Sequence, residues 1–475
     1  MYSKTTCFVK IGTKRTKNFD YNRGVRQGCI LSPILFNLYL NDLPNLLDTT
    51  SFTDPIRISN GLKISSLFYA DDLVLLSHSR QGLQNSLNAL SNFCNKWHMS
   101  INEKKSKIMI FTNKKLSKPP TFNINSKPLN QVDDYTYLGV KITASGNFSP
   151  HLKQIKDKAL HAFFKLSRKI NIRNLKPDIA SKLFDTFISP ILTYSSEIWS
   201  LYSKPSFENW DKIDVEKVHL RFCRYYLGVN NKSSNVACRA EMGRFPLKIV
   251  IDKLTLKFFN HLISLPNDCI AKQCLILSDT LSKSNKNCYI TNLQKLMHNY
   301  SPNQTISINQ NFTNSFLNEL DSSMKTYYFN LWKQLLGNSP KLSFYATFKE
   351  YYDEENYLNI INNFDQRKQF TKFRICNHNL AIETGRYSKP KTPRDQRYCL
   401  LCNDNKVESE EHMIFECSIY SDFRKHLQSK LTNKIDFSIN NSKSLMNSTD
   451  DEIIFYLSTF LWKSFSLRQE ILSKI

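Results

Sequence analysis

The stretch Phe68-Tyr69-Ala70-Asp71-Asp72-Leu73-Val74-Leu75-Leu76 decides how this sequence is interpreted, because two adjacent acids interrupt a run of strand-forming residues. Two such runs joined by two residues predict a β-hairpin whose connection is Asp71-Asp72. Like charges this close, with apolar neighbours, repel each other and are poorly solvated. A divalent metal removes that repulsion, and two-metal phosphoryl transfer uses such hard oxygen ligands to hold ions about 3.5–4 Å apart. An exposed turn without an ion is the alternative, and the hairpin alone does not decide between them.

Three further segments carry residue types that suit a nucleotide site. Gly24 and Gly28 allow the backbone to approach a ligand closely, Arg26 offers a charge-assisted contact to phosphate, and Gln27 offers an amide to a base or sugar. The same residues can also have no role in binding. Arg26 is then an ordinary loop arginine, Ser32 caps a helix, and the lysines are simply solvated. The segments are Arg23-Gly24-Val25-Arg26-Gln27-Gly28-Cys29-Ile30-Leu31-Ser32-Pro33, Asn102-Glu103-Lys104-Lys105-Ser106-Lys107 and Tyr137-Leu138-Gly139-Val140.

In this order, the four segments resemble the motifs of reverse transcriptases from non-LTR (LINE-type) retrotransposons. The resemblance implies an RNA-directed DNA polymerase, in which a primer 3′-hydroxyl attacks the α-phosphate of a dNTP. It makes Asp71 and Asp72 the catalytic Mg²⁺ ligands and places Lys105 near the pyrophosphate as a proton donor. It assigns the nucleotide pocket to Arg26, Gln27, Gly28, Tyr69 and Ala70. A relationship to group II intron or telomerase enzymes fits the C-terminal cysteines less well.

Polymerases of this family use one more aspartate, from a palm strand well upstream of the Arg-Gly-x-x-Gln-Gly signature. Only 22 residues precede Arg23, and Asp20 is their sole acid. We therefore expect an N-terminally truncated protein without the fingers and the first palm strand. Two carboxylates without the third do not assemble the metal pair in the usual way, so we expect little or no polymerase activity from this chain alone.

The charge balance favours a polyanionic partner. Lys and Arg number 65 against 41 Asp and Glu, a net charge of +24, which predicts salt-dependent binding to nucleic acid first and to an acidic membrane surface second. No apolar run is long enough for a membrane span, and no signal peptide is visible. The 12 cysteines in so long a chain do not resemble a secreted disulfide scaffold. The expectation is an intracellular, nuclear or cytoplasmic protein with RNA template, DNA primer and dNTP as partners.

The hydrophobic pattern divides the chain into six parts with an overall α+β fold. Residues 1–145 alternate short strands and helices, including a helix from Ile34 to Leu43 with Leu35, Leu38 and Tyr39 on one face. The family resemblance makes them part of a polymerase palm. The other parts are a helical thumb-like region (146–275), a polar insertion or linker (276–315), a helical region (316–394), a zinc knuckle (395–425) and a C-terminal helical segment (426–475).

Cys399, Cys402, His412 and Cys417 supply four ligands, enough for a closed tetrahedral zinc site. The Cys-x₂-Cys spacing in an intracellular chain favours a metal over a disulfide. Four protein ligands leave no open position, so the predicted zinc is structural. The element resembles the Cys/His element that follows the polymerase in LINE-type proteins. Whether it binds nucleic acid stays open, and the basic residues before it are the better candidates for such a contact.

Two other interpretations remain open at this stage. One is a non-catalytic nucleic-acid-binding remnant that keeps the basic helices and the zinc element. The other is a decayed reading frame without a selected role. Activity that requires Asp71 and Asp72 separates the polymerase from both, and salt-sensitive nucleic-acid binding by a folded chain separates the remnant from the decayed frame.

Overall fold

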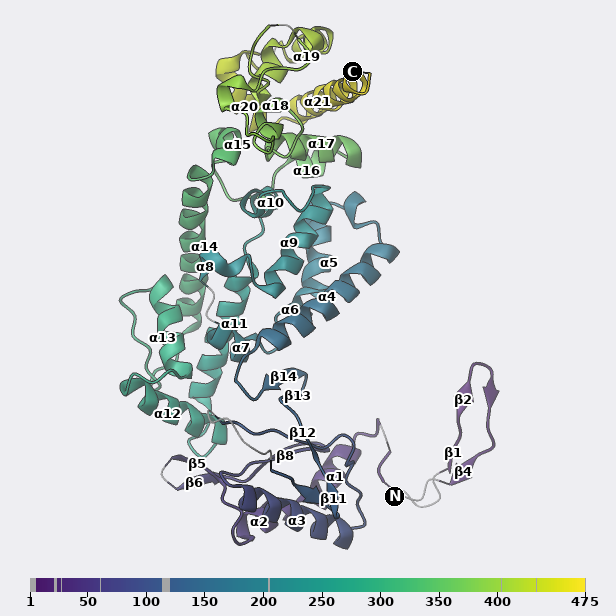
Figure 1. Cartoon of the computed structure of the whole chain (residues 1–475), viewed down its shortest axis with the longest axis vertical. Coiled ribbons are helices and arrows are strands. Elements are labelled where there is room, and N and C mark those ends of the chain that lie inside the picture. Colours follow the sequence, from purple (N-terminus) through teal and green to yellow (C-terminus); the bar gives the residue numbers. More distant parts are fainter. Residues whose placement is uncertain are drawn as a thin grey trace. The chain divides into compact units, whose positions relative to one another are not determined.

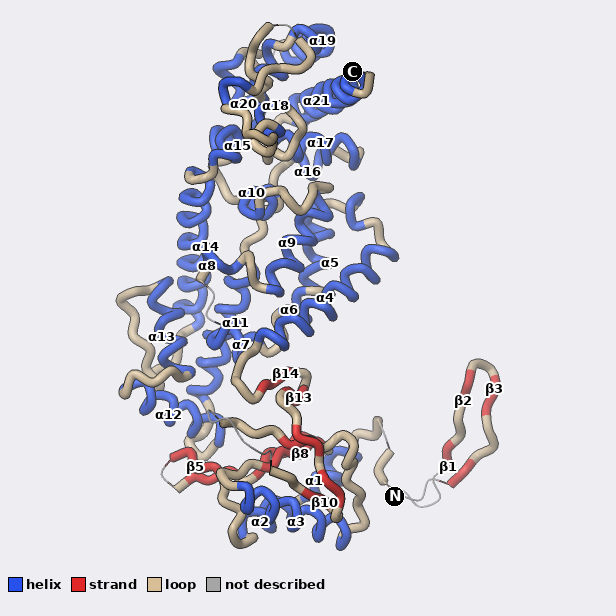
Figure 2. The backbone as a smooth tube through the Cα atoms, viewed as in Figure 1, coloured by secondary structure: helices blue, strands red, loops and turns tan. Residues whose placement is uncertain are grey.

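A computed structural model describes residues 6–20, 24–26, 28–59, 61–112, 120–203, 206–402, 404–432 and 434–474. The chain forms two compact units. The N-terminal unit comprises residues 1–146 and 266–277, and the C-terminal unit comprises residues 147–265 and 278–475. Figure 1 labels their elements and Figure 2 separates strands from helices. Within the described residues, every strand precedes residue 144, and the C-terminal unit is built from helices.

The strands of the N-terminal unit pair two by two. Five pairs are antiparallel hairpins between consecutive strands, β1 pairs with β4 across the β2–β3 hairpin, and β9 pairs with β12 in parallel. Three helices accompany them, so this unit mixes α and β elements as the sequence predicts. The strands are β1 (Thr6–Cys7), β2 (Lys10–Ile11), β3 (Lys14–Arg15), β4 (Phe19–Asp20), β5 (Ile56–Ser59), β6 (Leu62–Ile64), β7 (Ser66–Tyr69), β8 (Asp72–Leu75), β9 (Lys107–Ile108), β10 (Asn123–Ile124), β11 (Lys127–Pro128), β12 (Asn130–Gln131), β13 (Asp134–Tyr137) and β14 (Val140–Thr143).

Helix α3 (Arg80–Lys96) organises the core of the N-terminal unit. Its N-cap Ser79 accepts a hydrogen bond from the Gly82 backbone N–H at 3.1 Å, which satisfies a free helix donor. Gly82 must be glycine, because a Cβ there would lie 2.4 Å from the Thr53 carbonyl oxygen. Leucines and Phe93 at helical spacing pack against α2 (Asp42–Thr49), whose Leu47 is fully buried. This core supports the β7–β8 hairpin from one side.

Helix α1 (Ser32–Leu40) forms where a helix was predicted, after Ser32-Pro33, but its apolar face is not buried by the described residues. Leu38 is 67% exposed, and Ile34, Leu35 and Tyr39 are exposed as well. Helix periodicity predicts that Leu35, Leu38 and Tyr39 share one face, and it predicts nothing about what covers that face. Periodicity identifies the face but does not provide the surface that covers it.

The remaining helices build the C-terminal unit, apart from α12, which lies across the boundary between the two units. They are α4 (Ser149–Lys169), α5 (Pro177–Phe187), α6 (Ser189–Leu192), α7 (Ser196–Ser203), α8 (Phe207–Trp210), α9 (Asp214–Leu227), α10 (Asn235–Glu241), α11 (Leu247–Ser264), α12 (Ile270–Lys283), α13 (Tyr289–Tyr300), α14 (Asn314–Gly337), α15 (Ser343–Phe348), α16 (Tyr357–Ile360), α17 (Phe364–Arg374), α18 (Ala381–Thr384), α19 (Ser421–Leu431), α20 (Ser442–Met446) and α21 (Asp451–Leu472). Short helical turns are η1 (Ile172–Asn174), η2 (Pro340–Leu342), η3 (Arg394–Gln396), η4 (His412–Glu416), η5 (Ser418–Tyr420) and η6 (Ile439–Asn441).

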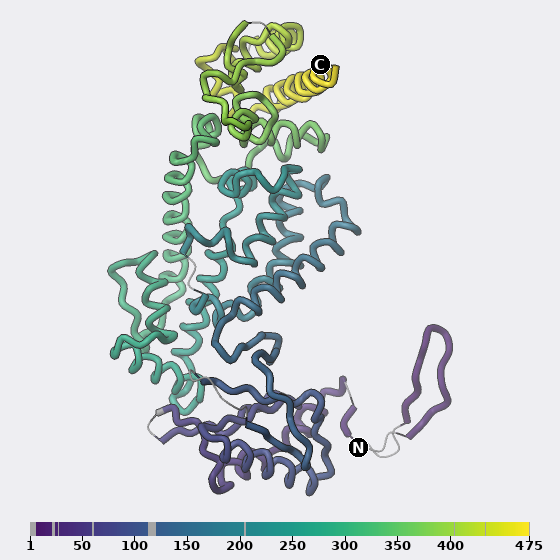
Figure 3. The backbone as a smooth tube through the Cα atoms, viewed as in Figure 1, coloured from purple at the N-terminus to yellow at the C-terminus, as the bar shows by residue number. Residues whose placement is uncertain are grey.

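After Ser149-Pro150, the sequence predicts a helix with an apolar stripe of Leu152, Ile155, Ala159, Phe163, Leu166 and Ile170, and the first of these helices buries the first four of them. Helix α4 begins at Ser149 and buries Leu152, Ile155, Ala159 and Phe163. It packs against α9, and distant segments meet in the same way near the C-terminus, where α21 lies against α17 and α19 (Figure 3). The sequence predicts a second helix from about Asp178 to Trp199, with a bend at Pro190. The chain instead breaks it into α5, α6 and α7, because Pro190 lacks an N–H and Ser195 adopts a left-handed φ of 52°.

The segment 276–315, expected to be a polar insertion or linker, contains an ordered helix. Within α13, Ile290, Leu293 and Met297 are fully buried. These few apolar residues recur three and four positions apart, so they form one helical stripe despite the polar composition around them. Composition therefore misled the prediction at this segment, and periodicity was the better guide.

A buried ion network joins two segments more than one hundred residues apart in the C-terminal unit. The Arg374 guanidinium lies 3.0 Å from Glu241 and 2.7 Å from Glu355, and the Tyr357 hydroxyl donates to Glu241 at 2.7 Å. Lys349 also pairs with Glu355. Arg374 and Glu241 are 1% and 0% exposed, so each charge depends on the other for compensation. Helices α10 and α17 are thus fixed to each other by charge as well as by packing.

No helix among the described residues is both long enough and apolar enough to cross a bilayer.

Candidate functional site: the carboxylate hairpin and the Cys/His cluster

The predicted carboxylate hairpin is present, with its turn one residue earlier than expected. Strand β7 pairs with β8 so that Tyr69 lies opposite Asp72, which leaves Ala70-Asp71 as the two-residue connection. Ala70 adopts a φ of 53°, the left-handed backbone that such tight loops require at their first position. The prediction of an Asp71-Asp72 connection was therefore wrong by one residue, because Asp72 takes part in the strand pairing.

Burial separates the two parts of this hairpin. Phe68, Leu73 and Leu75 pack against the core around α3, whereas Asp71 and Asp72 are exposed and Tyr69 is 63% exposed. The ribbon is thus anchored by its apolar side chains while both carboxylates stand at its tip. Exposed carboxylates there can accept a hard cation or remain hydrated.

The hairpin tip lies close to another predicted motif. Burial raises the pKa of Tyr137, and the negative charge of Asp72 raises it further. Tyr137 ends β13, and Leu138 and Gly139, with φ of 46° and 83°, turn the chain into β14. The structure therefore brings Asp72 and the Tyr137-Leu138-Gly139-Val140 segment together, although 65 residues separate Asp72 from Tyr137 along the chain.

Lys105, Arg26 and Gly28, which are also predicted nucleotide-site residues, lie in exposed loops and turns. Lys105 is exposed in a turn where its N–H donates to Asn102 Oδ1 at 3.1 Å, and among the described residues no ion pair links it to Asp71 or Asp72. The Arg26 carbonyl accepts a hydrogen bond from the Ser32 hydroxyl at 2.6 Å. Gly28 has a φ of 82°. Gln27 lies outside the described residues.

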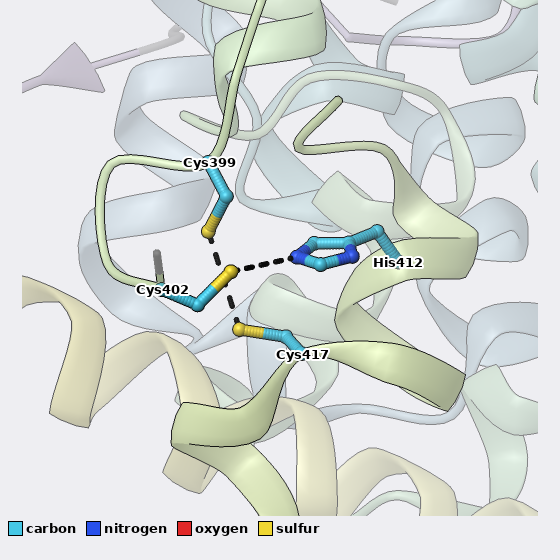
Figure 4. A group of neighbouring side chains, drawn as sticks. All are labelled: Cys399, Cys402, His412 and Cys417. Atoms are coloured by element: carbon cyan, nitrogen blue, oxygen red, sulfur yellow. Dashed lines mark hydrogen bonds between the residues drawn. The ribbon is translucent and has the colours of Figure 1, made fainter. Parts of the chain in front are cut away.

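The second site brings together Cys399, Cys402, His412 and Cys417, whose ligand atoms all lie within 4.8 Å of one another (Figure 4). Cys399 Sγ is 4.0 Å from Cys417 Sγ, and Cys402 Sγ is 3.4 Å from His412 Nε2. Tetrahedral zinc with Zn–S bonds of about 2.3 Å separates its sulfur ligands by about 3.8 Å. The four groups therefore fit a closed tetrahedral metal site.

Local backbone structure produces this arrangement. The Cys399 N–H donates to the Lys406 carbonyl at 2.8 Å, which folds Cys399 and Cys402 into one turn. His412 begins a π-helical turn, η4, in which the Cys417 N–H donates to the His412 carbonyl at 2.8 Å. This five-residue hydrogen bond widens the turn and brings both side chains to one side. Two short local motifs thus assemble the four ligands.

Polar neighbours support the cluster. His412 Nδ1 lies 3.3 Å from Glu416 Oε2, and a carboxylate at this position orients a metal-binding imidazole. The Arg424 guanidinium donates to the Cys417 carbonyl at 2.6 Å. The hydrogen bond from the Cys417 thiol lowers the pKa of Cys399, and the same bond raises the pKa of Cys417. A cysteine already biased toward the thiolate is suited to ligate a cation.

The prediction named the four ligands but not the residues that hold them. Glu416 could have been found, because it lies four residues after His412 on a helical turn. Arg424 and the buried pair of Glu408 with Arg468, at 2.7 Å, give no signal in the sequence. Their partners lie on other elements, and only the tertiary structure brings them together.

Comparison with known proteins agrees with this picture. The sequence model of the family "Reverse transcriptase (RNA-dependent DNA polymerase)" matches residues 2–142. The chain is 27% identical over 188 residues to the RNA-directed DNA polymerase from mobile element jockey of Drosophila funebris. The aligned residues make up 38% of this chain and 20% of that protein. It is 28% identical over 201 residues to the probable RNA-directed DNA polymerase from transposon BS of Drosophila melanogaster, covering 40% and 21%.

A third relative comes from another element. The chain is 28% identical over 193 residues to the retrovirus-related Pol polyprotein from type-1 retrotransposable element R2 of Popillia japonica, covering 39% of this chain and 30% of that protein. The chain spans about a fifth of the length of the first two relatives. The matched residues 2–142 contain the carboxylate hairpin and the Tyr137 turn. The chain therefore carries a reverse transcriptase region related to the RNA-directed DNA polymerases of non-LTR retrotransposons.

Proposed function

We propose that residues 2–142 contribute Asp71 and Asp72 to two-metal nucleotidyl transfer in an RNA-directed DNA polymerase. The observation that carries the proposal is the pair of exposed carboxylates at the tip of a core-anchored hairpin, inside the segment that matches the family. Magnesium ions bound there would lower the pKa of the primer hydroxyl and neutralise charge on the phosphates. The protein's part is to hold both carboxylates in fixed positions.

Neighbouring residues complete the proposed nucleotide site. Tyr69 and Ala70 flank Asp71 and border the bound nucleotide, and Arg26, Gln27 and Gly28 contact its phosphates, sugar and base. Lys105 donates a proton to the departing pyrophosphate. Positive φ at Gly28 and Ala70 supports close backbone approach to a ligand. The template is RNA, the primer is DNA and the substrates are dNTPs.

The C-terminal unit takes the supporting roles. Residues 146–275, most of which belong to the C-terminal unit, form a thumb-like helical region whose basic faces contact the template–primer backbone. Cys399, Cys402, His412 and Cys417 hold a structural zinc ion that fixes the fold of residues 395–425. The donor set supports this role, because three thiols and one imidazole suit zinc and leave no open coordination position.

Metal-dependent nucleotide binding by the purified 475-residue chain tests the polymerase proposal. Mn²⁺, followed by electron paramagnetic resonance, would be titrated in the presence of a dNTP. Asp71→Asn with Asp72→Asn should weaken nucleotide-dependent Mn²⁺ binding at least about tenfold, because each carboxylate supplies a hard oxygen ligand. Asp20→Asn with Asp42→Asn removes the same charge from exposed positions of the same unit and should leave binding unchanged.

Primer extension on an RNA template with Mg²⁺ gives the second readout. Any synthesis by the chain must disappear in the Asp71→Asn, Asp72→Asn variant. Synthesis that survives in that variant, or equal Mn²⁺ binding in both double variants, would contradict the assignment of the two aspartates.

A non-catalytic nucleic-acid-binding protein is the second candidate, favoured by the net charge of +24. It predicts salt-dependent binding of RNA and DNA that is indifferent to both aspartates and to divalent metal. Nucleotide-dependent Mn²⁺ binding at Asp71 and Asp72 would exclude it as the sole function.

A further inference from the structure

A strongly basic cleft lies in the C-terminal unit, and its lining shares no residue with either candidate site. It has a volume of about 290 Å³ and is bordered by the end of α9 and by the start of α17, two helices that contact each other (Figure 1). Its charged lining consists of Arg173, Arg221, Arg224 and Lys368. Among the described residues, no acidic side chain lines it.

Arg173 is held rigidly in this cleft. Its guanidinium carbon lies 4.1 Å from the centre of the Tyr225 ring and 5.1 Å from the centre of the Phe364 ring. Its Nε donates to the Tyr225 carbonyl at 3.1 Å. Cation–π contacts and one hydrogen bond thus fix the guanidinium plane before any ligand arrives. A fixed guanidinium loses little entropy on binding a planar or tetrahedral oxyanion.

The other two arginines also have neutral partners. Arg221 lies 4.7 Å over the Phe164 ring. Arg224 donates to Asn235 and to the Ser233 carbonyl, and its Nε is buried without a hydrogen-bond partner among the described residues. In the described part of the chain, none of the three arginines forms an ion pair. Only Lys368 has a carboxylate nearby, that of the exposed Asp365 at 3.4 Å.

Two fully buried arginines of the same unit are compensated in a different way. Buried Arg239 and Arg374 each pair with two carboxylates, which is how a folded protein normally compensates charge at low exposure. The C-terminal end of α9 adds only a partial negative charge, about half of one elementary charge. Three clustered guanidinium groups with neutral neighbours therefore leave a strong positive potential that an external anion can neutralise.

The packing of the two helices keeps the cleft in place. Gly228 ends α9 with a φ of 70°, and a Cβ at this position would lie 2.8 Å from Phe364 Cζ. Glycine therefore permits the close approach of α9 and α17 that brings Lys368 beside the arginines. The site combines residues that are nearly two hundred positions apart.

We propose that this cleft binds a backbone phosphate of a nucleic acid. The inference deepens the proposed function and rests on its nucleic-acid partner, because it names the residues of the C-terminal unit that contact the backbone. The planar guanidinium group of arginine donates two parallel hydrogen bonds and carries a positive charge, so it matches phosphate oxygens in geometry and charge. A contact of this kind positions the nucleic acid without selecting its sequence.

Salt-dependent binding of fluorescent single-stranded RNA and duplex DNA tests the proposal on the full chain. Arg221→Gln with Lys368→Gln should weaken binding about tenfold at moderate salt and reduce the slope of log K against log[salt] by about 1, the effect of losing one phosphate contact. The matched control is Lys257→Gln with Lys295→Gln, which removes the same charge from exposed positions of α11 and α13. It should change affinity by less than about twofold.

A second variant separates a built site from general positive charge. Arg173→Lys keeps the charge but loses the fixed guanidinium plane, and it should weaken binding severalfold. Inorganic phosphate at constant ionic strength should compete with the oligonucleotide for wild type and not for Arg221→Gln, Lys368→Gln. Thermal unfolding of each variant shows that the fold is retained.

The outcomes distinguish the two proposals. Equal losses in the cleft and control variants, or no loss in either, would overturn the phosphate site. Phosphate binding that requires Arg221 and Lys368 while oligonucleotide affinity is unchanged would make the cleft a site for free phosphate and overturn the nucleic-acid assignment. Failure of wild type to bind any nucleic acid would instead overturn the nucleic-acid partner of the proposed function.

Discussion

The carboxylate hairpin and the Cys/His cluster satisfy their polar groups in opposite ways. Asp71 and Asp72 stand exposed at a tip, with no third carboxylate, histidine or cysteine grouped with them among the described residues. The ligands of the cluster are largely buried and already hold one another, with Glu416 and Arg424 behind them. The hairpin thus leaves its carboxylates open to a cation or to water, whereas the four side chains of the cluster are already grouped closely enough to hold an ion.

The surroundings of the two sites repeat this contrast. In the N-terminal unit, α1 leaves Leu38 and neighbouring apolar side chains exposed. In the C-terminal unit, even buried charges such as Glu241 and Arg374 find partners. A buried group that is satisfied by a partner should respond strongly to the loss of that partner, and an exposed group should respond weakly.

The largest expected effect is loss of the metal site. Cys399→Ser with Cys402→Ser should abolish binding of one zinc ion per chain, measured by elemental analysis, and should expose the amides of residues 398–417 to hydrogen exchange. Structural zinc contributes about 10 kcal/mol or more to the order of such elements. The control Cys269→Ser with Cys274→Ser should keep its zinc. Zinc retained in the first variant, or absent from wild type, would refute the structural metal site.

Glu241→Gln should cost the C-terminal unit about 3–5 kcal/mol in chemical denaturation, because Arg374 then stays buried without full compensation. Exposed Glu208→Gln is the matched control and should cost less than about 0.5 kcal/mol. A small effect of Glu241→Gln would show that the network contributes little to stability.

The same carboxylate predicts a pH dependence. Burial raises the pKa of Glu241, but the charges of Arg374 and Lys349 outweigh it and lower the pKa below the usual value. The stabilisation is therefore complete above about pH 4.3 and is lost as the pH falls below it. Wild type should lose stability more steeply than Glu241→Gln on acidification, which denaturation at several pH values would measure.

Within the N-terminal unit, position in the core should decide the cost of a leucine. Leu47→Ala should destabilise the unit by about 3 kcal/mol, because it removes a fully buried side chain. Leu38→Ala, on the exposed face of α1, should change stability by less than about 0.5 kcal/mol. A large loss of unfolding free energy in Leu38→Ala, measured by denaturant unfolding, would mean that this face of α1 is buried in the purified protein.

The smallest expected effect concerns the hairpin tip itself. Asp72→Asn should lower the pKa of Tyr137, because it removes a negative charge that disfavours the tyrosinate. Tyrosine NMR signals followed through an alkaline titration would show it. Asp71→Asn should leave the Tyr137 titration close to that of wild type, and the reverse order of the two variants would contradict the register of the hairpin.

Local sequence patterns predicted a good part of the molecule. The hairpin, α3, α4 and the Cys/His ligands all follow from residues close together in the chain, whose spacing fixes which side chains share a face or a turn. The turn position was missed by one residue because strand pairing, not residue type, decides where a turn begins. The helix α13 was missed because its polar composition hid a regular apolar stripe.

The sequence by itself determined the identity of the reverse transcriptase region and the four candidate zinc ligands, since motif order and short spacings are local properties. Only the tertiary structure decided that the charge of Asp72 acts on Tyr137, that Glu241 compensates Arg374, and that Arg173, Arg221 and Lys368 line one cleft. Those pairs are separated by long stretches of chain. Their proximity depends on how helices and hairpins pack, which no local pattern encodes.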